Sequence, residues 1–458
     1  MLDQWDPSSP NAQDELHEAF TTQRSRADGQ VFVGVTSTKI YCRPTCHARS
    51  PKRENRRYFT TTAAAEAAGF RPCLMCRPEL APGMPANSPL ANATQVEPDQ
   101  IRLTEQLHLA KMLAADTLLP LDRVAHAAGF ANEDDLAMAL KRHYRLDLAK
   151  LRRPKKDPAS ERDAISFRLC YRPPYRFDDL LGFFRMRQLE GVERVDDRSY
   201  ARTVRIPAGG AVHAGWIEVT NDPRANAVRL TMSRSLLPVA SQVVQKVRRL
   251  FDLDCDPQSV HEGLTSLDDL RPGARRKGTR LPGCFDPFET CCRAILGQQV
   301  TVVAANKLAA RIVSAYGPAV QTPFPELSRA WPSPQEMLAL GNLQEKLGVL
   351  GTIKTRSACI GRIAEAMTSG NLPLDDSLPA PEQMERLLAL KGIGPWTANY
   401  IAMRVLSYPD AFLESDAGVK HALPDLSPKE RLTAAESWRP WRSYAVVSLW
   451  NSLSPQND

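Results

Sequence analysis

Two tight pairs of cysteines constrain how the first eighty residues of this chain can fold. Three residues separate Cys42 from Cys46, two separate Cys73 from Cys76, and twenty-six lie between the pairs. Four thiolates at these spacings can close a tetrahedral zinc site with a loop between the pairs. The sequence therefore predicts Zn²⁺ bound by all four cysteines, either in a structural zinc ribbon or in a reactive site.

The other six cysteines are scattered along the chain without the spacing of a disulfide framework. This usage is typical of buried thiols in a reducing compartment. No apolar stretch approaches the roughly 20 residues that span a bilayer, and the first ten residues are polar and acidic, unlike a signal peptide. We therefore expect a cytoplasmic protein that has no membrane partner.

Two proline-rich segments divide the 458 residues into parts with different patterns. Residues 81–98 and 153–163 lack hydrophobic periodicity and are expected to be linkers. The pattern between them is helical, residues 165–233 form short alternating segments typical of strands, and the chain is almost entirely helical after residue 285. The sequence thus predicts a multidomain α+β protein with domains at 1–80, 99–153, 164–250 and 251–458.

Residues 101–152 include the string VAHAAGF followed by LAMALKRHYRLDLAKLR, which resembles an AraC-type helix-turn-helix. Residues 141–156 carry eight Lys or Arg and one acid, which favours phosphate contact over an ordinary solvated helix face. Only one such unit is present where AraC-type binding uses two. The expected recognition helix also begins with the string NEDD at residues 132–135, whose acids would repel phosphates. We therefore expect a non-specific DNA tether.

The strings YCRPTC, RENRRYF and AAGFRPCLMC surround the paired cysteines. Residues 31–35 have the pattern of a strand, and an alanine-rich helix is expected to end at Gly69. Over residues 31–78 these strings resemble the N-terminal zinc domain of the Ada family of methyl acceptors. In that family a zinc thiolate accepts the methyl group of a DNA methylphosphotriester, and the resemblance gives this role to Cys42.

The same resemblance implies that three further side chains contact the DNA backbone, although each is equally compatible with an ordinary surface residue. These side chains are Thr38, Arg49 and Arg71.

The string LKGIGPWTANYIAMR at residues 390–404 is the most informative part of the C-terminal half. Gly392 and Gly394 flank a single isoleucine, so they predict a tight hairpin between two helices whose backbone N–H groups can approach a phosphate closely. The following helix presents its N-terminus to the same anion. The sequence therefore predicts a helix-hairpin-helix motif that binds one DNA strand.

Asp416, in the string FLESDAGVKHAL, follows Gly394 by twenty-two residues. A carboxylate at this distance beyond the hairpin is typical of helix-hairpin-helix glycosylases. An aspartate before a helix is, without other information, more often an N-cap. Because the hairpin lies upstream, we expect Asp416 to be catalytic.

Further strings, among them PPYRFDDLLGFF, RLFDLDCDPQ, LPGCFDPFE, RAILGQQV and SWRPWRSYA, lie between residue 165 and the C-terminus. Together with the hairpin string they resemble the AlkA family of alkylpurine DNA glycosylases. The resemblance implies a small antiparallel α+β (TBP-like) domain followed by an all-helical helix-hairpin-helix glycosylase domain.

The resemblance also implies the chemistry. Asp416 would stabilise the positive charge that develops on the sugar and orient the attacking water. The damaged base would leave the stack and enter an aromatic pocket formed by Phe183, Trp396, Tyr400 and Trp450, because a cationic base favours aromatic faces. The alternative is that these aromatic residues only fill the core.

Three positions refine this expectation. Gln299 stands where the family inserts a wedge side chain into the gap that the extruded base leaves in the DNA stack. The alternative is that Gln299 is a helix cap or an ordinary surface residue. Bifunctional relatives have a lysine where Trp396 stands, so we expect a monofunctional enzyme that uses water and leaves an abasic site. Ala417 replaces an aromatic residue of the family, which predicts a smaller pocket wall and tolerance of bulkier adducts.

We therefore expect a monomeric enzyme that excises alkylated purines such as 3-methyladenine and 7-methylguanine from double-stranded DNA and accepts methyl groups on Cys42. The net charge of +7 is compatible with DNA binding, but so many proteins share such a charge that it does not by itself indicate a DNA partner. Two alternatives remain: a methylation-sensing transcriptional regulator whose C-terminal half only binds DNA, and a zinc-stabilised scaffold whose cysteines accept no methyl group. No Pro-Cys-His-Arg motif is present, so we expect no O6-methylguanine transferase activity.

Overall fold

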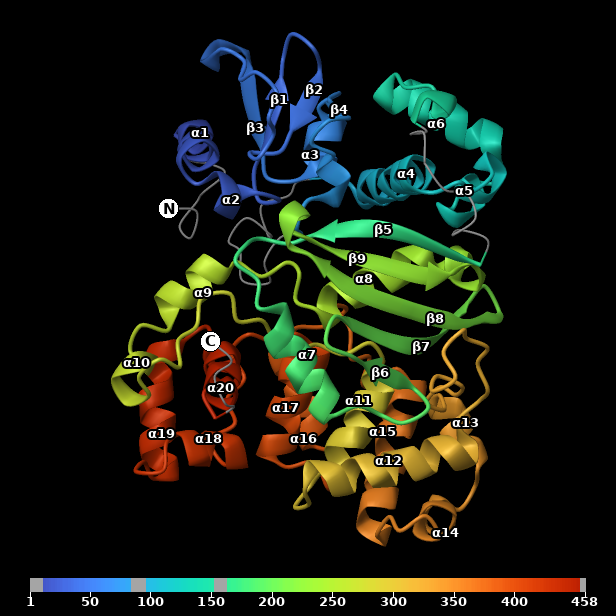
Figure 1. The fold of residues 1–458 in the computed structure, drawn as a ribbon, viewed down its shortest axis with the longest axis vertical. Coiled ribbons are helices and arrows are strands. Elements are labelled where there is room, and N and C mark those ends of the chain that lie inside the picture. Colours follow the sequence, from blue (N-terminus) through green and yellow to red (C-terminus); the bar gives the residue numbers. More distant parts are fainter. Residues whose placement is uncertain (1–10, 84–95, 152–162, 454–458) are drawn as a thin grey trace.

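The computed structural model describes residues 11–83, 96–151 and 163–453. The predicted linkers lie largely outside these ranges. Along the long axis, a small β-domain and a helical segment lie at one end, a five-stranded sheet lies in the middle, and a helical body lies at the other end (Figure 1). Among the described helices, none combines the length and the apolar character that a membrane span requires.

The N-terminal domain is built on a four-stranded sheet in the order β3-β1-β2-β4. The predicted strand at residues 31–35 is confirmed as β1, and the alanine-rich helix is confirmed as α3, with Thr61 as its N-cap and Gly69 at φ +79° after its end. Its strands are β1 (Phe32–Val35), β2 (Ile40–Cys42), β3 (Arg56–Phe59) and β4 (Arg71–Pro72). Its helices are α1 (Ala12–Thr22), α2 (Arg24–Ala27), η2 (Arg53–Asn55), α3 (Thr62–Ala67) and η3 (Pro78–Leu80).

The helical segment has the predicted helix-turn-helix form. The Asn132 side chain caps α6 by accepting from Asp135 N at 2.9 Å, and Gly129 at φ +85° turns the chain between the two short helices. The segment shares one hydrophobic core with the central sheet, in which Leu113 and Ile165 are both buried. Its helices are α4 (Pro98–Asp116), α5 (Leu121–Ala127), α6 (Glu133–Tyr144) and η5 (Leu148–Leu151).

The central sheet is antiparallel in the order β5-β9-β8-β7-β6, as the resemblance to the AlkA family implies. One of its faces is covered by α8, whose Val243 and Val247 are fully buried. Its strands are β5 (Ala164–Cys170), β6 (Glu193–Val195), β7 (Ser199–Ala208), β8 (Ala211–Asp222) and β9 (Ala227–Ser233). Its helices are α7 (Phe177–Met186), η7 (Pro223–Ala225), η8 (Arg234–Val239) and α8 (Ala240–Leu250).

The helical body contains two hydrophobic cores, and α17 packs between them. Ile401 belongs to one core and Met403 to the other, so the position of α17 is fixed from both sides. The first helices of the body are α9 (Pro257–Gly263), α10 (Leu267–Leu270), α11 (Pro287–Leu296), α12 (Val302–Tyr316), α13 (Pro334–Ala339), α14 (Leu343–Gly348) and α15 (Lys354–Thr368). The last are α16 (Ala380–Leu388), α17 (Pro395–Val405), α18 (Ala417–Ala422), α19 (Pro428–Ala435), η9 (Glu436–Trp438) and α20 (Arg442–Asn451).

Polar contacts fix the N-terminal domain to the rest of the chain. Arg26 Nε donates to Asp256 Oδ2 at 3.0 Å. The buried Arg172 donates from Nη1 to the carbonyl of Asp254 at 2.6 Å and from Nη2 to that of Gly83 at 2.7 Å. These contacts, which the sequence pattern does not predict, join segments far apart in the chain.

Candidate active site and metal centre

The glycine hairpin between α16 and α17 forms where the sequence predicts it. Gly392 has φ +102°, and a Cβ at this position would lie 3.0 Å from Cys359 Sγ. Gly394 is the N-cap of α17, and a Cβ there would meet no atom within 4 Å. The open space at Gly394 lets a ligand approach the first backbone N–H groups of α17.

Asp416 caps α18 and also lies at the wall of a cavity. Its Oδ1 accepts hydrogen bonds from the backbone N–H groups of Gly418 at 2.8 Å and Val419 at 3.2 Å. The indole Nε1 of Trp450 donates to the same oxygen at 2.8 Å, and Trp396 Nε1 donates to Oδ2 at 3.2 Å. Four N–H groups therefore fix the orientation of a half-buried carboxylate.

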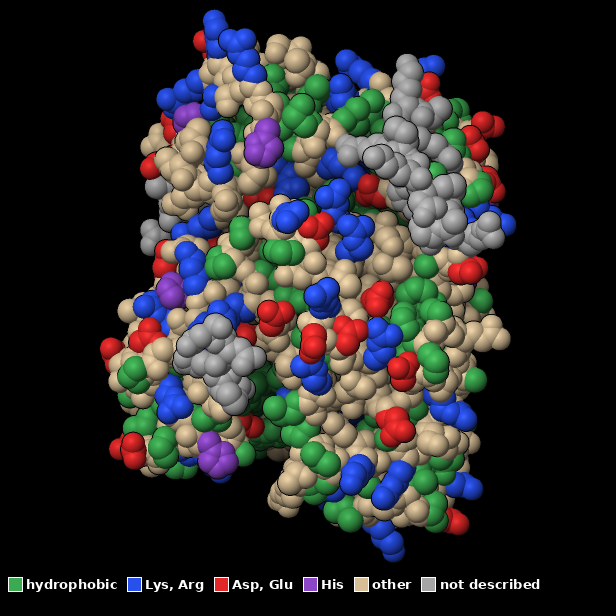
Figure 2. Space-filling model, viewed as in Figure 1, with side chains coloured by type: hydrophobic (Ala, Val, Ile, Leu, Met, Phe, Trp, Pro, Cys, Tyr) green, Lys and Arg blue, Asp and Glu red, His purple; other side chains and the backbone are tan. Residues whose placement is uncertain are grey.

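The cavity beside Asp416 has a volume of about 1230 Å³. The helical body forms one half of the molecule, and Figure 2 shows a deep hollow in the surface of this half. Trp396, Tyr400 and Trp450 line the cavity, and the rings of Trp396 and Tyr400 stack with centroids 5.1 Å apart. Phe183 stacks on Trp450 with centroids 5.8 Å apart. The structure therefore gathers the four predicted aromatic residues in one cluster.

Arginines adjoin this aromatic cluster, and the sequence interpretation did not include them. Arg404 Nη1 donates to Tyr400 Oη at 2.7 Å, and the Arg187 guanidinium carbon lies 3.8 Å from the centroid of Phe183. Burial alone would raise the pKa of Tyr400, but Arg404 and Arg187 lower it below its usual value. The four-residue spacing from Phe183 to Arg187 and from Tyr400 to Arg404 is the signal that could have predicted both contacts.

Gln299 is exposed at the rim of the cavity and has a φ of +56°. Its neighbour Gln298 donates from Nε2 to Gly392 O and to Thr397 Oγ1, both at 3.0 Å. Arg356 donates to the backbone carbonyl of Gln298. These contacts connect the turn that carries Gln299 to the glycine hairpin.

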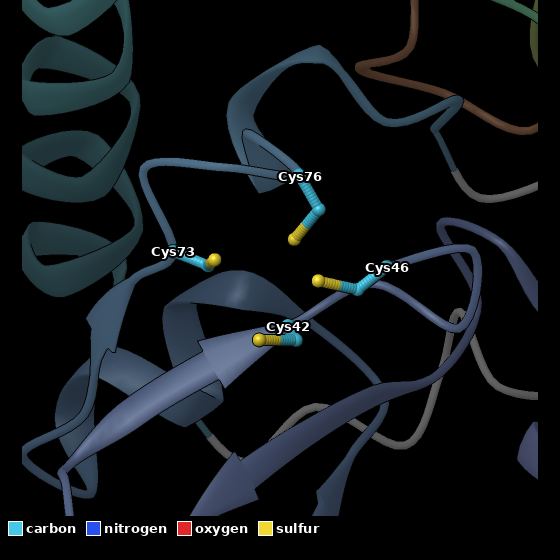
Figure 3. A group of neighbouring side chains, drawn as sticks. All are labelled: Cys42, Cys46, Cys73 and Cys76. Carbon is cyan, nitrogen blue, oxygen red and sulfur yellow. The ribbon is translucent and has the colours of Figure 1, made fainter. Parts of the chain in front are cut away.

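The paired cysteines converge on one point in the N-terminal domain (Figure 3). Cys42 ends β2, and the parallel pairing of β2 with β4 brings it beside the second pair. The four sulfur atoms lie within 4.8 Å of one another, which fits a tetrahedral ion with Zn–S bonds of about 2.3 Å. The backbone N–H of Arg43 donates to Cys76 Sγ at 3.4 Å, as suits a thiolate acceptor. The donor set and its geometry therefore fit Zn²⁺.

The predicted DNA-contacting residues of the N-terminal domain lie apart from the cavity. Thr38 and Arg49 are exposed, Arg71 is half-buried, and none of the three lines the cavity beside Asp416.

Within the metal centre, Cys42 is buried whereas Cys76 is partly exposed.

Two segments of the chain match models of known protein families. Residues 15–79 match the metal binding domain of Ada, and residues 166–286 match the AlkA N-terminal domain. A probable bifunctional transcriptional activator/DNA repair enzyme AlkA of Mycobacterium tuberculosis is 32% identical, over 96% of this chain and 96% of that protein. DNA-3-methyladenine glycosylase 2 of Escherichia coli is 37% identical, over 64% of this chain and 99% of that protein.

A solved structure shares the fold of the C-terminal part. The 3-methyladenine DNA-glycosylase from Archaeoglobus fulgidus superposes with a TM-score of 0.50 at 21% identity, over 62% of this chain and 97% of that chain. The Ada-type metal binding domain, with its four converging thiolates, identifies the cofactor as Zn²⁺. Because the similarity extends along nearly the whole sequence, the chain belongs to the family of bifunctional transcriptional activator/DNA repair enzymes AlkA.

Proposed function

We propose that this chain repairs DNA by hydrolysing the N-glycosidic bond of alkylated purines, such as 3-methyladenine and 7-methylguanine, in double-stranded DNA. The observation that carries the proposal is the position of Asp416, whose carboxylate is fixed at the cavity wall by the indole N–H groups of Trp396 and Trp450. A C-terminal half that only bound DNA would need no such carboxylate in an aromatic cavity.

The mechanism begins when the damaged base leaves the duplex stack and enters the cavity. As the bond between C1′ and the base nitrogen breaks, its electron pair leaves with the base and positive charge develops on the sugar. The Asp416 carboxylate stabilises this charge and orients the water that attacks C1′. The products are the free base and an abasic site in an intact strand, because Trp396 cannot supply an amine nucleophile.

The residues around the cavity bind the DNA strand. The hairpin at Gly392 and Gly394 presents backbone N–H groups to a phosphate of the damaged strand. Gln299 fills the gap left by the extruded base and hydrogen-bonds its former partner. The contacts from Gln298 to Gly392 and Thr397 support the proposal, since they fix the spacing between hairpin and wedge.

We propose a second activity at the metal centre, the transfer of a methyl group from a DNA methylphosphotriester to Cys42. Bound Zn²⁺ keeps the thiolates deprotonated at neutral pH. The Cys42 sulfur attacks the methyl carbon, the carbon–oxygen bond breaks, and its electron pair stays on the phosphate oxygen. A thioether and a phosphodiester anion result, with Thr38, Arg49 and Arg71 in contact with the backbone. The loss of one negative charge from the centre then strengthens phosphate binding.

We further propose that the chain acts as a monomer, with its parts divided at 1–80, 99–153, 164–250 and 251–458. Residues 99–153 would bind DNA without sequence specificity. The acids in the first turn of α6, two of them exposed, support this assignment because they would repel phosphates in a major groove.

A duplex with a single 7-methylguanine tests the main proposal on the full-length, zinc-loaded protein. We expect release of the free base and a strand that breaks only after hot alkali. Absence of base release would overturn the glycosylase proposal. After incubation with DNA that carries methylphosphotriesters, peptide mass spectrometry should find the methyl group on Cys42, and a methyl group on Cys46 or Cys76 would contradict that assignment.

A further inference from the structure

Glu66, in α3, is a carboxylate buried between the N-terminal domain and the helical segment, with only 3% of its side chain exposed. Its Oε1 accepts hydrogen bonds from Tyr41 Oη at 2.7 Å and Tyr144 Oη at 2.8 Å, and lies 3.0 Å from His108 Nε2. Its Oε2 accepts a hydrogen bond from Thr104 Oγ1 at 2.8 Å. Side chains from β2, α4 and α6 therefore meet at one carboxylate.

The charge of Glu66 is held differently from that of a second buried carboxylate at the same interface. Glu79 pairs with two cations, Arg77 at 2.9 Å and Lys111 at 2.5 Å. Among the described residues, Glu66 has neither an arginine nor a lysine at ion-pair distance, and three of its four partners are hydroxyl groups. A buried charge without such a cation is stabilised only by well-placed hydrogen-bond donors, so these hydroxyl groups are held at defined positions.

Tyr41 connects this carboxylate to the metal centre. It precedes Cys42 in β2 and is fully buried. Its backbone carbonyl accepts a hydrogen bond from the N–H of Cys73 at 3.0 Å. Tyr41 is thus bonded covalently to a cysteine of the first pair and by a hydrogen bond to a cysteine of the second pair, whose sulfur atoms face the same centre (Figure 3). The position of Tyr41 therefore fixes how the two pairs lie relative to each other.

Methyl transfer depends strongly on the position of the Cys42 sulfur. The sulfur, the methyl carbon and the departing phosphate oxygen must lie in line, and a misplacement of about 1 Å can lower a rate by about a hundredfold. Cys42 is buried whereas Cys46 and Cys76 are partly exposed, so packed neighbours restrict its movement. A contact that fixes the strand at Cys42 therefore affects this reaction more than a contact elsewhere in the interface.

We propose that Glu66 and Tyr41 are positioning residues for methyl transfer. The carboxylate fixes the Tyr41 hydroxyl, and the Tyr41 backbone in turn holds Cys42 where its sulfur can attack. This inference rests on the proposed methyl transfer and adds residues that are neither metal ligands nor proposed DNA contacts. The helical segment takes part, because Thr104 and Tyr144 hold the carboxylate in place from outside the Ada-type domain.

The two tyrosines that bind Glu66 form a matched pair for testing this role. Both are fully buried, and both donate to the same oxygen at nearly equal distances. Tyr41 precedes a cysteine of the metal centre, whereas Tyr144 is the last residue of α6. Tyr41→Phe and Tyr144→Phe each remove one phenol donor from the same carboxylate, but only Tyr41→Phe releases the strand that carries Cys42.

Single-turnover methyl transfer to the full-length, zinc-loaded protein, from a duplex with one methylphosphotriester, measures the effect. We expect Tyr41→Phe to lower the rate by about tenfold or more at unchanged DNA affinity, because the sulfur is displaced while the DNA contacts remain. Tyr144→Phe should retain the rate. Glu66→Gln should lower the rate as Tyr41→Phe does, and the variant with both changes should be no slower than Tyr41→Phe alone, because the two residues act through one contact.

The absorption spectrum of the full-length protein with Co²⁺ in place of Zn²⁺ gives a readout that does not depend on activity. Its thiolate-to-metal bands report how the four sulfur atoms surround the ion. Tyr41→Phe and Glu66→Gln should shift these bands, whereas Tyr144→Phe should not. The melting temperature should fall by similar amounts in the two tyrosine variants, since each loses one buried hydrogen bond.

Equal transfer rates in the two tyrosine variants, or unshifted bands in Tyr41→Phe, would show that Tyr41 only stabilises the fold and would overturn the inference. If Tyr41→Phe does not fold, Glu66→Gln decides in its place, and an unchanged rate in that variant overturns the inference. These results would leave the proposed methyl transfer standing. If the unchanged protein leaves Cys42 unmethylated, the proposed methyl transfer is itself overturned, together with the inference.

Discussion

Trp450 donates its indole N–H to the Oδ1 of Asp416 at 2.8 Å. The same oxygen accepts hydrogen bonds from the backbone N–H groups of Gly418 and Val419 in the first turn of α18. The carboxylate is therefore positioned by a pocket aromatic residue and by a helix terminus at once. An N-cap aspartate and a catalytic aspartate are usually alternatives, but at this position one side chain can serve as both.

The first prediction concerns that hydrogen bond. Trp450→Phe keeps an aromatic ring in the cavity but removes the N–H donor, so the Asp416 carboxylate loses one of its fixed contacts. Hydrogen bonds to charged groups contribute roughly 1.5–3 kcal/mol, so we expect single-turnover excision of 7-methylguanine to fall by about 10- to 100-fold. Trp441→Phe, a change at a half-buried tryptophan outside the cavity lining, is the control. Equal rates for both variants would contradict the assignment.

The second prediction separates the two hairpin glycines. Gly392→Ala forces a side chain into a left-handed conformation and places its Cβ 3.0 Å from Cys359 Sγ, so it should lower the free energy of unfolding by roughly 1–2 kcal/mol. Gly394→Ala meets no atom of the protein within 4 Å, so it should leave the melting temperature unchanged but weaken DNA binding. Unchanged DNA affinity in Gly394→Ala would show that no strand approaches this backbone.

The third prediction concerns Ala417, the first residue of α18, which is exposed and lines the cavity. Ala417→Tyr adds a ring at this wall and should exclude large guests before small ones. We expect the rate on 1,N6-ethenoadenine to fall more than the rate on 3-methyladenine. A constant ratio of the two rates would remove Ala417 from the determinants of lesion size.

The fourth prediction concerns stability and pH. Burial raises the pKa of Asp252 from 3.8 to about 6, although Arg280 and the bonds from Leu281 N and Tyr444 Oη oppose the rise. Between these pH values the folded state binds more protons than the unfolded state, so stability should fall as pH rises from about 4 to 6, by at most about 3 kcal/mol.

Asp252→Asn removes this titration and keeps an oxygen that accepts both bonds. Asparagine also tolerates the φ of +48° at this position. We expect the variant to be more stable than the unchanged protein above pH 6 and to lose the slope between pH 4 and 6. Denaturant unfolding at several pH values measures both effects, and parallel curves for the two proteins would contradict the prediction.

Local patterns predicted much of the fold. The strand at residues 31–35, the alanine-rich helix before Gly69 and the four-cysteine cluster all depend on short-range spacing, and the structure confirms each. The contacts between parts of the chain could not be predicted in the same way. Arg172 contacts residues from two distant segments, and no periodicity in a single sequence records such a pairing.

In the candidate site, too, short-range patterns could be predicted from the sequence and contacts between distant residues could not. The hairpin glycines and Asp416 stand at fixed spacings, so sequence could locate them, and the aromatic residues could be assigned by resemblance. The cations beside them were missed because an arginine in a sequence is most often a solvated surface residue. Only the structure places Arg187 at the Phe183 ring without a carboxylate partner among the described residues.

The single-turnover rate of Asp416→Asn on a duplex with one 7-methylguanine tests directly whether this carboxylate is catalytic. Asparagine is also a good N-cap, so α18 should remain folded while the negative charge is lost. We expect excision to fall by at least about a thousandfold with an unchanged melting temperature and unchanged DNA binding. Excision within a few-fold of the unchanged protein would show that this carboxylate does not stabilise the sugar cation and is not catalytic.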